Sequence, residues 1–185
     1  MRDGRPYAGT TEIVSTLEKV LARNPNHPGA NHYYIHAMEA NAPEKAEPAA
    51  DRLRALMPGA GHMVHMPSHI YQRVGRYADA QAANVAAIEA DEDYITQCRA
   101  QGLYPMAYYP HNIHFLWFAA TAEGRSQVAI QSARKTASKV SDESLGALPL
   151  LATFRVVPWW ALTRFGKWDE MLAANKEGFF PYTPA

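Results

Sequence analysis

The chain of 185 residues carries 18 basic and 18 acidic side chains, and 48% of its residues are hydrophobic. This balance creates no overall field that would recruit nucleic acid or an anionic membrane, and the length suits one compact domain. No apolar run could cross a membrane, the first residues lack the apolar core of a signal peptide, and the lone Cys98 excludes an internal disulfide. We therefore expect one cytoplasmic domain over residues 1–185, with neither nucleic acid nor membrane as a partner.

Helical periodicity predicts five helices in the first half of the chain, over residues 10–25, 28–39, 48–59, 62–75 and 77–91. Thr10 or Thr11 is the expected N-cap of the first helix. Pro67 interrupts the fourth helix and predicts either a kink or a later start, and a later start would leave His62 and His65 in the lead-in. The acidic run 89–93 at the end of the fifth helix is expected to be solvated.

Residues 93–109 break this pattern with Gly102 and Pro105 and are interpreted as an insertion. Helices are expected again over 111–124, 126–139, 156–166 and 168–178, with a connector at 141–151 and a tail at 179–185. No segment alternates in the manner of a strand. The sequence therefore predicts an all-α protein of about nine helices.

The predicted helices repeat. Gly75, Gly124 and Gly166 each open a similar turn and helix start, and Ala46 and Ala80 lie 34 residues apart. A helix–turn–helix unit of this length is typical of tetratricopeptide repeats, which the chain resembles over roughly residues 11–178. The resemblance implies a right-handed α-solenoid of antiparallel helix pairs. The opening helix resembles the second half of a repeat, which is compatible with a fragment of a longer protein.

Three segments also resemble a group of longer bacterial tetratricopeptide proteins: HPGANHYYIHAME, HMPSHIYQRVG and YYPHNIHF. This resemblance indicates a family but implies no particular reaction. These segments hold most of the histidines, at spacings of three or four residues that place the rings of each segment on one helix face. In tetratricopeptide arrays the first helix of each pair lines the concave groove, so the resemblance implies that these rings face one groove. The alternative is that they pack the groove and bond to tyrosines and carbonyls.

Neutral imidazole is a good ligand for transition metals, and neighbouring helices pack ~8–10 Å apart, so rings from several helices could share one ion. The sequence contains no HExxH or other specific metal motif. Zinc is the first candidate, with copper, iron or manganese as alternatives, and the surplus of histidines leaves room for a second ion. The predicted ligands are His32, His36, His65 and His69.

The other histidines of these segments, His62, His111 and His114, are candidates for further ligands or proton-transfer groups. Glu39 lies three residues after His36 and is the candidate general base. A histidine-bound ion with an open position lowers the pKa of bound water toward ~7. The first hypothesis is therefore a metal-dependent hydrolase acting on an ester or phosphoester in the groove.

Two other functions remain open at this stage. One is a non-catalytic scaffold that binds a peptide or protein partner in the groove, with or without structural metal, and the other is a redox copper or iron site. Arg73 and Arg155 are candidate contacts for an anionic group. Tyr104, Tyr108 and Tyr109, in the insertion, are candidates for a lid or pocket wall.

Overall fold

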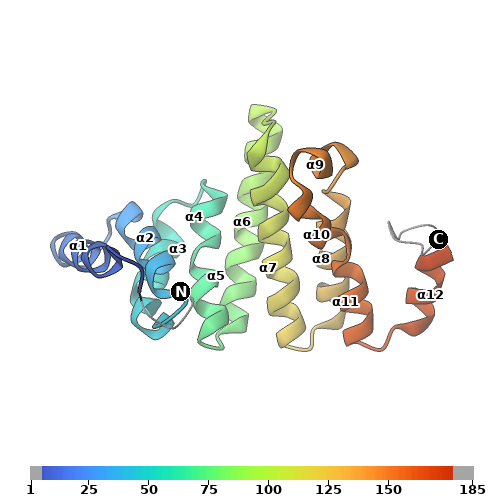
Figure 1. The fold of residues 1–185 in the computed structure, drawn as a ribbon, viewed down its shortest axis with the longest axis horizontal. Coiled ribbons are helices and arrows are strands. Elements are labelled where there is room, and N and C mark those ends of the chain that lie inside the picture. The colour runs from blue at the N-terminus through green and yellow to red at the C-terminus, as the bar shows by residue number, and fades with distance from the viewer. Residues whose placement is uncertain (1–5, 177–185) are drawn as a thin grey trace. The chain divides into compact units, whose positions relative to one another are not determined.

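The computed structural model describes residues 6–176, and every regular element within them is a helix (Figure 1). The prediction of an all-α protein is confirmed. Among these residues no helix has the length and apolar character needed to cross a membrane. The chain divides into two compact units, Met1–Tyr94 and Ile95–Ala185, each with its own helix packing. The expectation of a single domain stays a prediction.

The N-terminal unit follows the expected order of helices closely. Helices α1 and α2, α2 and α3, and α3 and α5 pack against each other. Helix α1 begins at Thr10, and its N-cap is Gly9, which has a φ of 85°. No side chain caps this helix end, so the predicted threonine N-cap is wrong. The elements are α1 (Thr10–Arg23), α2 (Pro28–Met38), η1 (Pro43–Ala46), α3 (Glu47–Leu56), α4 (Gly61–His65), α5 (Pro67–Arg73) and α6 (Tyr77–Cys98).

Helices α4 and α5 form one path that Pro67 interrupts. Met66 between them has helical dihedrals, with φ −51° and ψ −37°. Pro67 has no N–H to donate to the preceding turn, which is why the regular hydrogen-bond ladder stops and restarts there. A helix does start at Pro67, as the alternative of a later start predicted, and the lead-in that holds His62 and His65 is itself the short helix α4.

The core of this unit is built from large side chains on α2 to α5 and small ones on α6. Ile35, Leu53 and Tyr71 are fully buried. Helix α4 lies so close to α6 that a Cβ added to Gly61 would be 1.9 Å from the carboxylate Oδ1 of Asp91. Asp91 is fully buried, so the expected solvation of the acidic run 89–93 is wrong at this position.

The C-terminal unit is organised around α7 and α8, against which α11 packs. Its apolar core includes Trp117, Ile130, Val157 and Leu162. The elements that follow α6 are η2 (Tyr104–Tyr108), α7 (Tyr109–Ala122), α8 (Ser126–Ser138), α9 (Asp142–Ala147), η3 (Pro149–Leu151), α10 (Ala152–Arg155), α11 (Val157–Arg164) and α12 (Trp168–Lys176).

Two segments of this unit are more helical than expected. Most of the proposed insertion at 93–109 is helix, because α6 continues to Cys98 and the π-helical turn η2 leads directly into α7. The expected connector at 141–151 contains α9, which Ser141 caps by accepting a hydrogen bond from the Ser144 N–H at 3.0 Å. The expected tail at 179–185 lies outside the described residues.

The repeated turn signature has a common backbone geometry. Gly75, Gly124 and Gly166 all have positive φ, at 81°, 73° and 64°. After each of them an N–H donates back across the helix end to the carbonyl five residues earlier. These bonds join Arg76 to Tyr71 at 2.8 Å, Arg125 to Ala120 at 2.9 Å and Lys167 to Leu162 at 2.9 Å. Glycine adopts this left-handed helix end without strain, which explains its recurrence.

Candidate metal centre

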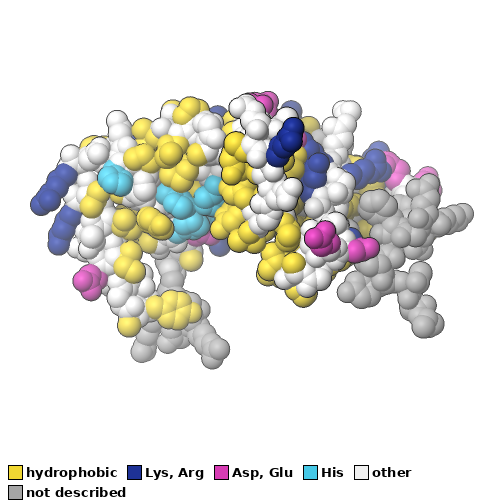
Figure 2. All heavy atoms as spheres, turned by 90° about the horizontal axis from the view of Figure 1, so that it is seen from above, with side chains coloured by type: hydrophobic (Ala, Val, Ile, Leu, Met, Phe, Trp, Pro, Cys, Tyr) yellow, Lys and Arg dark blue, Asp and Glu magenta, His cyan; other side chains and the backbone are white. Residues whose placement is uncertain are grey.

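Three histidines from two helices form the most compact group of potential ligands in the N-terminal unit. His32 and His36 lie one turn apart on α2, with their Nε2 atoms 3.2 Å from each other. His62 on α4 places its ring centroid 5.1 Å from that of His32, and the planes are perpendicular. One nitrogen from each of the three rings lies within 4.8 Å of the other two. Figure 2 shows histidine side chains gathered at the molecular surface.

Local structure explains why α2 presents these rings. Pro28 occupies the first turn of α2, and His27 caps it by accepting the Ala30 N–H at 3.1 Å. The buried face of the helix carries Tyr34 and Ile35 into the core. His32 and His36, four residues apart, consequently share a face that is only partly covered.

Burial keeps this group of imidazoles uncharged near neutral pH. It lowers the pKa of His32 and of His36, with neighbouring imidazoles adding to the effect in both cases. The pKa of His62 falls to about 4, again mainly through burial and then through repulsion from the neighbouring rings. Neutral imidazoles have a lone pair available, which is the form that binds transition metals.

A second pair of histidines lies beside the first group. His65 on α4 is fully buried, and its Nε2 is 3.0 Å from Nε2 of His69 on α5. Ring centroids of His36 and His69 are 5.8 Å apart, and those of His62 and His65 are 6.2 Å apart. The structure therefore brings the four predicted ligands and His62 into one region.

Glu39, at the C-terminal end of α2, contacts both groups. Its Oε2 lies 3.0 Å from Nδ1 of His69 and 3.8 Å from Nδ1 of His36. Burial alone would raise the pKa of this carboxyl, but the adjacent His69 and the charges of His36 and Arg73 lower it overall. Glu39 is therefore a carboxylate at neutral pH. Its role as a general base stays a prediction.

The sequence analysis missed two polar residues of this site. Asn84 on α6 is fully buried, and its Oδ1 lies 2.7 Å from Nδ1 of His65. Ser68 is also buried, with Oγ 3.3 Å from the same nitrogen. Asn84 interrupts the small apolar residues of α6, and a polar residue on such a buried face is the clue that could have identified it.

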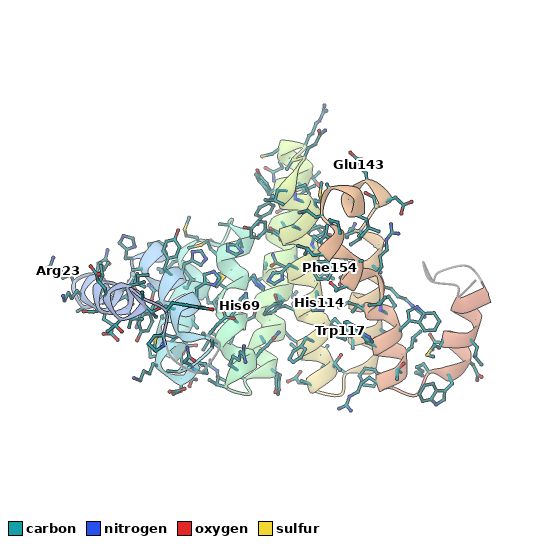
Figure 3. The ribbon with its side chains drawn as sticks, viewed as in Figure 1. Arg23, His69, His114, Trp117, Glu143 and Phe154 are labelled. Carbon is teal, nitrogen blue, oxygen red and sulfur yellow. The ribbon has the colours of Figure 1, made fainter. Side chains whose placement is uncertain are left out.

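The remaining candidate histidines lie on α7 in the C-terminal unit. His114 packs among aromatic rings, 4.9 Å from Trp117 and 5.2 Å from Phe154 between centroids (Figure 3). Burial lowers its pKa to about 4. The ring centroid of His111 is 4.6 Å from that of Phe115. The predicted roles of His111 and His114 as ligands or proton-transfer groups stay predictions.

Other candidate residues have structural contacts of their own. Arg155 donates to the Val140 carbonyl at 3.0 and 2.8 Å and to Asp142 at 2.7 Å, so its guanidinium ties α10 to the start of α9. In η2, the rings of Tyr104 and Tyr108 stack with centroids 5.5 Å apart, and Tyr109 is buried. Arg73 is exposed at the end of α5.

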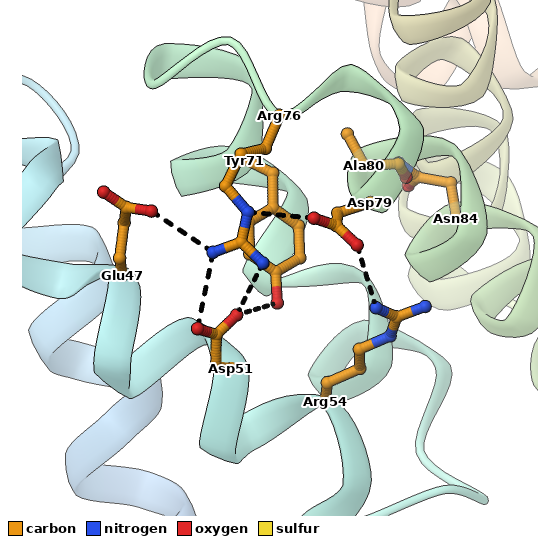
Figure 4. A network of polar contacts seen from close by, with 8 residues as sticks. All are labelled: Glu47, Asp51, Arg54, Tyr71, Arg76, Asp79, Ala80 and Asn84. Atoms are coloured by element: carbon orange, nitrogen blue, oxygen red, sulfur yellow. Dashed lines mark hydrogen bonds and ion pairs between the residues drawn. The ribbon is translucent and has the colours of Figure 1, made fainter.

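An ion network lies beside α5, the helix that carries His69. The Arg76 guanidinium, 4.4 Å above the Tyr71 ring, donates to Glu47 at 3.2 Å, to Asp51 at 3.0 Å and to Asp79 at 2.9 Å (Figure 4). The network joins α3 to the start of α6 next to α5.

No protein-family model, curated protein or solved structure matches this chain, so its function rests on the geometry of the site itself.

Proposed function

We propose that the N-terminal unit is a metal-dependent hydrolase in which His32, His36 and His62 bind a divalent transition-metal ion, with zinc the preferred candidate. The observation that carries this proposal is the convergence of three imidazole nitrogens within 4.8 Å of one another. Two nitrogens bound to a tetrahedral zinc at ~2.0–2.1 Å lie about 3.3 Å apart. The Nε2 separation of 3.2 Å between His32 and His36 is close to this value.

Three histidine ligands leave one position of a tetrahedral ion open, as in catalytic zinc sites. When bound, the ion would supply a water molecule whose pKa is lowered to ~7, and hence hydroxide near neutral pH. The chain holds its imidazoles in the neutral form that such binding needs, because burial lowers the pKa of all three. The substrate class is an ester or phosphoester.

We also propose that α2 with α3, and α4 and α5 with α6, are successive tetratricopeptide-like pairs of a right-handed solenoid. The shared helix-end geometry after Gly75, Gly124 and Gly166 supports a structural repeat. In this arrangement the histidines occupy the first helix of each pair, which is the position that faces the groove in such arrays.

The test combines metal analysis with turnover. We expect the protein, purified without a histidine tag, to contain stoichiometric metal and to hydrolyse p-nitrophenyl esters or phosphoesters until a chelator removes the ion. His36 is 44% exposed, so His36→Ala leaves the core intact and should remove both metal and activity. His27→Asn is the matched control, because it removes an exposed histidine and keeps a residue that caps α2.

Metal that binds without any turnover would replace this proposal with the scaffold alternative, in which the ion is structural. In that case chelation should lower the melting temperature instead of an activity. Protein that neither contains nor takes up metal would contradict the proposal entirely.

A further inference from the structure

The protonation of His65 is fixed by its surroundings. Asn84 Nδ2 donates to the Ala80 carbonyl oxygen at 2.8 Å, and because that oxygen can only accept, the amide must turn its Oδ1 toward His65. The amide oxygen likewise only accepts, so the His65 Nδ1 at 2.7 Å carries the proton. A neutral His65 therefore has its lone pair on Nε2.

His69 approaches His65 from α5. Its Nε2 lies 3.0 Å from Nε2 of His65, and its Nδ1 lies 3.0 Å from Oε2 of Glu39. This Glu39 oxygen is buried and has no hydrogen-bond partner among the described residues. A buried carboxylate oxygen without a hydrogen bond is stabilised by a nearby cation, and the two Nε2 atoms offer a place to bind one.

We propose that His65 Nε2 and His69 Nε2 bind a second metal ion beside the first, which makes the histidine site a two-metal centre. This inference rests on the proposed function. Two nitrogens in neighbouring positions around one ion at ~2.0–2.1 Å lie about 3–3.4 Å apart, and the observed 3.0 Å fits. Histidine ligands typically donate their other N–H to a carboxylate or carbonyl oxygen, as His65 does to the amide oxygen of Asn84.

Glu39 links the two ligand groups. Its Oε2 contacts His69 of the second pair at 3.0 Å and lies 3.8 Å from His36 of the first group. The ring separations of 5.8 Å between His36 and His69 and 6.2 Å between His62 and His65 place the two groups side by side. A carboxylate shared in this way would orient ligands of both ions and offset part of their charge.

Two adjacent ions favour phosphoesters over carboxylic esters, because together they stabilise the attacking and leaving oxygens of an in-line displacement at phosphorus. In this reaction the water oxygen forms a new bond to phosphorus and the bond to the leaving alcohol oxygen breaks. A proton from the water ends on the alcohol, so the products are an alcohol and a phosphate with one ester bond fewer. Arg73 is exposed, and its charge helps to lower the pKa of the Glu39 carboxyl. Its guanidinium therefore lies near enough to the site to offset the negative charge of a phosphate.

The first test counts ions. The purified protein, saturated with Zn²⁺ and dialysed, should contain two ions per chain by elemental analysis, and His69→Ala should contain one. His27→Asn should keep two. His69 is 13% exposed, so circular dichroism and a melting curve must show that His69→Ala is folded, and His69→Gln provides a second variant if it is not.

The outcomes separate the two proposals. One ion in the wild type that is lost in His36→Ala but kept in His69→Ala overturns the second ion and leaves the hydrolase proposal standing. One ion in the wild type that is lost both in His36→Ala and in His69→Ala indicates a single shared site, and this result also overturns the second ion. No ion in the wild type overturns both proposals.

The second test uses probes of both ester classes. His69→Ala should lower the ratio of bis(p-nitrophenyl) phosphate turnover to p-nitrophenyl acetate turnover on the order of 100-fold. An equal loss with both esters would overturn the assignment of a phosphoester substrate. Electron paramagnetic resonance of a Cu²⁺-loaded sample gives a readout that is independent of activity. Two adjacent Cu²⁺ ions couple magnetically, so the signal of the wild type should be weak. His69→Ala should bind a single Cu²⁺ ion and restore the signal.

Discussion

Both units carry histidines one helical turn apart, but the chemistry around them differs. In the N-terminal unit, His36 and His69 contact other imidazoles and the carboxylate of Glu39. In the C-terminal unit, His114 packs between the rings of Trp117 and Phe154. The pKa of His62 in the first unit and of His114 in the second falls to about 4, so a lowered pKa alone does not identify a metal ligand.

What distinguishes the two units is the set of atoms that the ring nitrogens face. Nitrogens of His32 and His36 approach each other, and His62 joins them from another helix. Spacing along one helix can produce such a pair, but only packing between helices can add the third ring. A histidine cluster is therefore a property of helix packing.

The largest expected effect is a loss of stability of the C-terminal unit at acidic pH, caused by His114. His114 titrates at about 4 in the folded chain but near its ordinary value of 6.5 when unfolded. The unfolded state therefore takes up the proton first, and stability that is complete above pH 6.5 is lost as the pH falls toward 4. The expected loss is about 2–3 kcal/mol after allowing for partial exposure.

His114→Phe keeps an aromatic ring among Trp117 and Phe154 and should remove this part of the acid sensitivity. The measurement is urea unfolding of wild type and variant at pH 7 and pH 4.5. A variant whose stability falls with pH as steeply as that of the wild type would show that His114 is not the group responsible. Metal content should be unchanged if the imidazole only packs.

The next prediction concerns the placement of α4 in the N-terminal unit. Gly61→Ala would put a methyl group 1.9 Å from Asp91 Oδ1 and 2.9 Å from the Ala87 carbonyl oxygen. We expect a loss of about 1–3 kcal/mol in the free energy of unfolding, together with weaker metal binding, because α4 carries His62 and His65. Gly146→Ala in the C-terminal unit meets no atom within 4 Å and is the control. Equal stability of the two variants would contradict the close packing of α4 on α6.

The sequence allowed the all-α class and most helix positions to be predicted, because apolar periodicity and proline positions are local signals. It also placed His32, His36, His65 and His69 in one region, since they recur at similar positions of neighbouring helices. It named His62 only as a further ligand or proton-transfer group and did not single it out as the partner of His32 and His36, because the register between α2 and α4 depends on packing.

Asn84 shows the same limit from another direction. It lies 19 residues after His65 in the sequence, on the alanine-rich helix α6, and nothing in the spacing links the two residues. The buried Asp91 beside Gly61 was missed for a similar reason: an acidic run near a helix end is usually solvated, and only the close approach of α4 encloses this carboxylate. Long-range polar contacts of this kind are set by tertiary structure.

A smaller effect is expected from Asn84 itself. Asn84→Leu fills the same space without accepting the His65 Nδ1 proton, so His65 can adopt either tautomer. Loss of such a supporting group typically weakens metal binding ~10–100-fold. Competition with a metal indicator dye would measure this, with Ser132→Ala on α8 of the C-terminal unit as a buried polar control. Unchanged affinity in Asn84→Leu would show that the tautomer of His65 is not relevant to metal binding.

The smallest expected effect compares the same turn position in the two units. Arg76 follows the left-handed Gly75 and joins Glu47, Asp51 and Asp79, whereas Lys167 follows Gly166 and is exposed. Exposed ion pairs contribute little singly, but several carboxylates around one guanidinium act together, and the Arg76 stem also covers the Tyr71 ring.

We therefore expect Arg76→Ala to cost about 1 kcal/mol of unfolding free energy and Lys167→Ala to stay within about 0.5 kcal/mol of wild type. The Arg76 contribution should shrink as salt rises, since screening weakens exposed charges. Urea unfolding at low and high salt measures both effects. If Arg76→Ala lowers the free energy of unfolding by the same amount at low and high salt, the stabilisation comes from packing on Tyr71 and not from the carboxylates. The polar network would then be a consequence of the helix packing and not a cause of it.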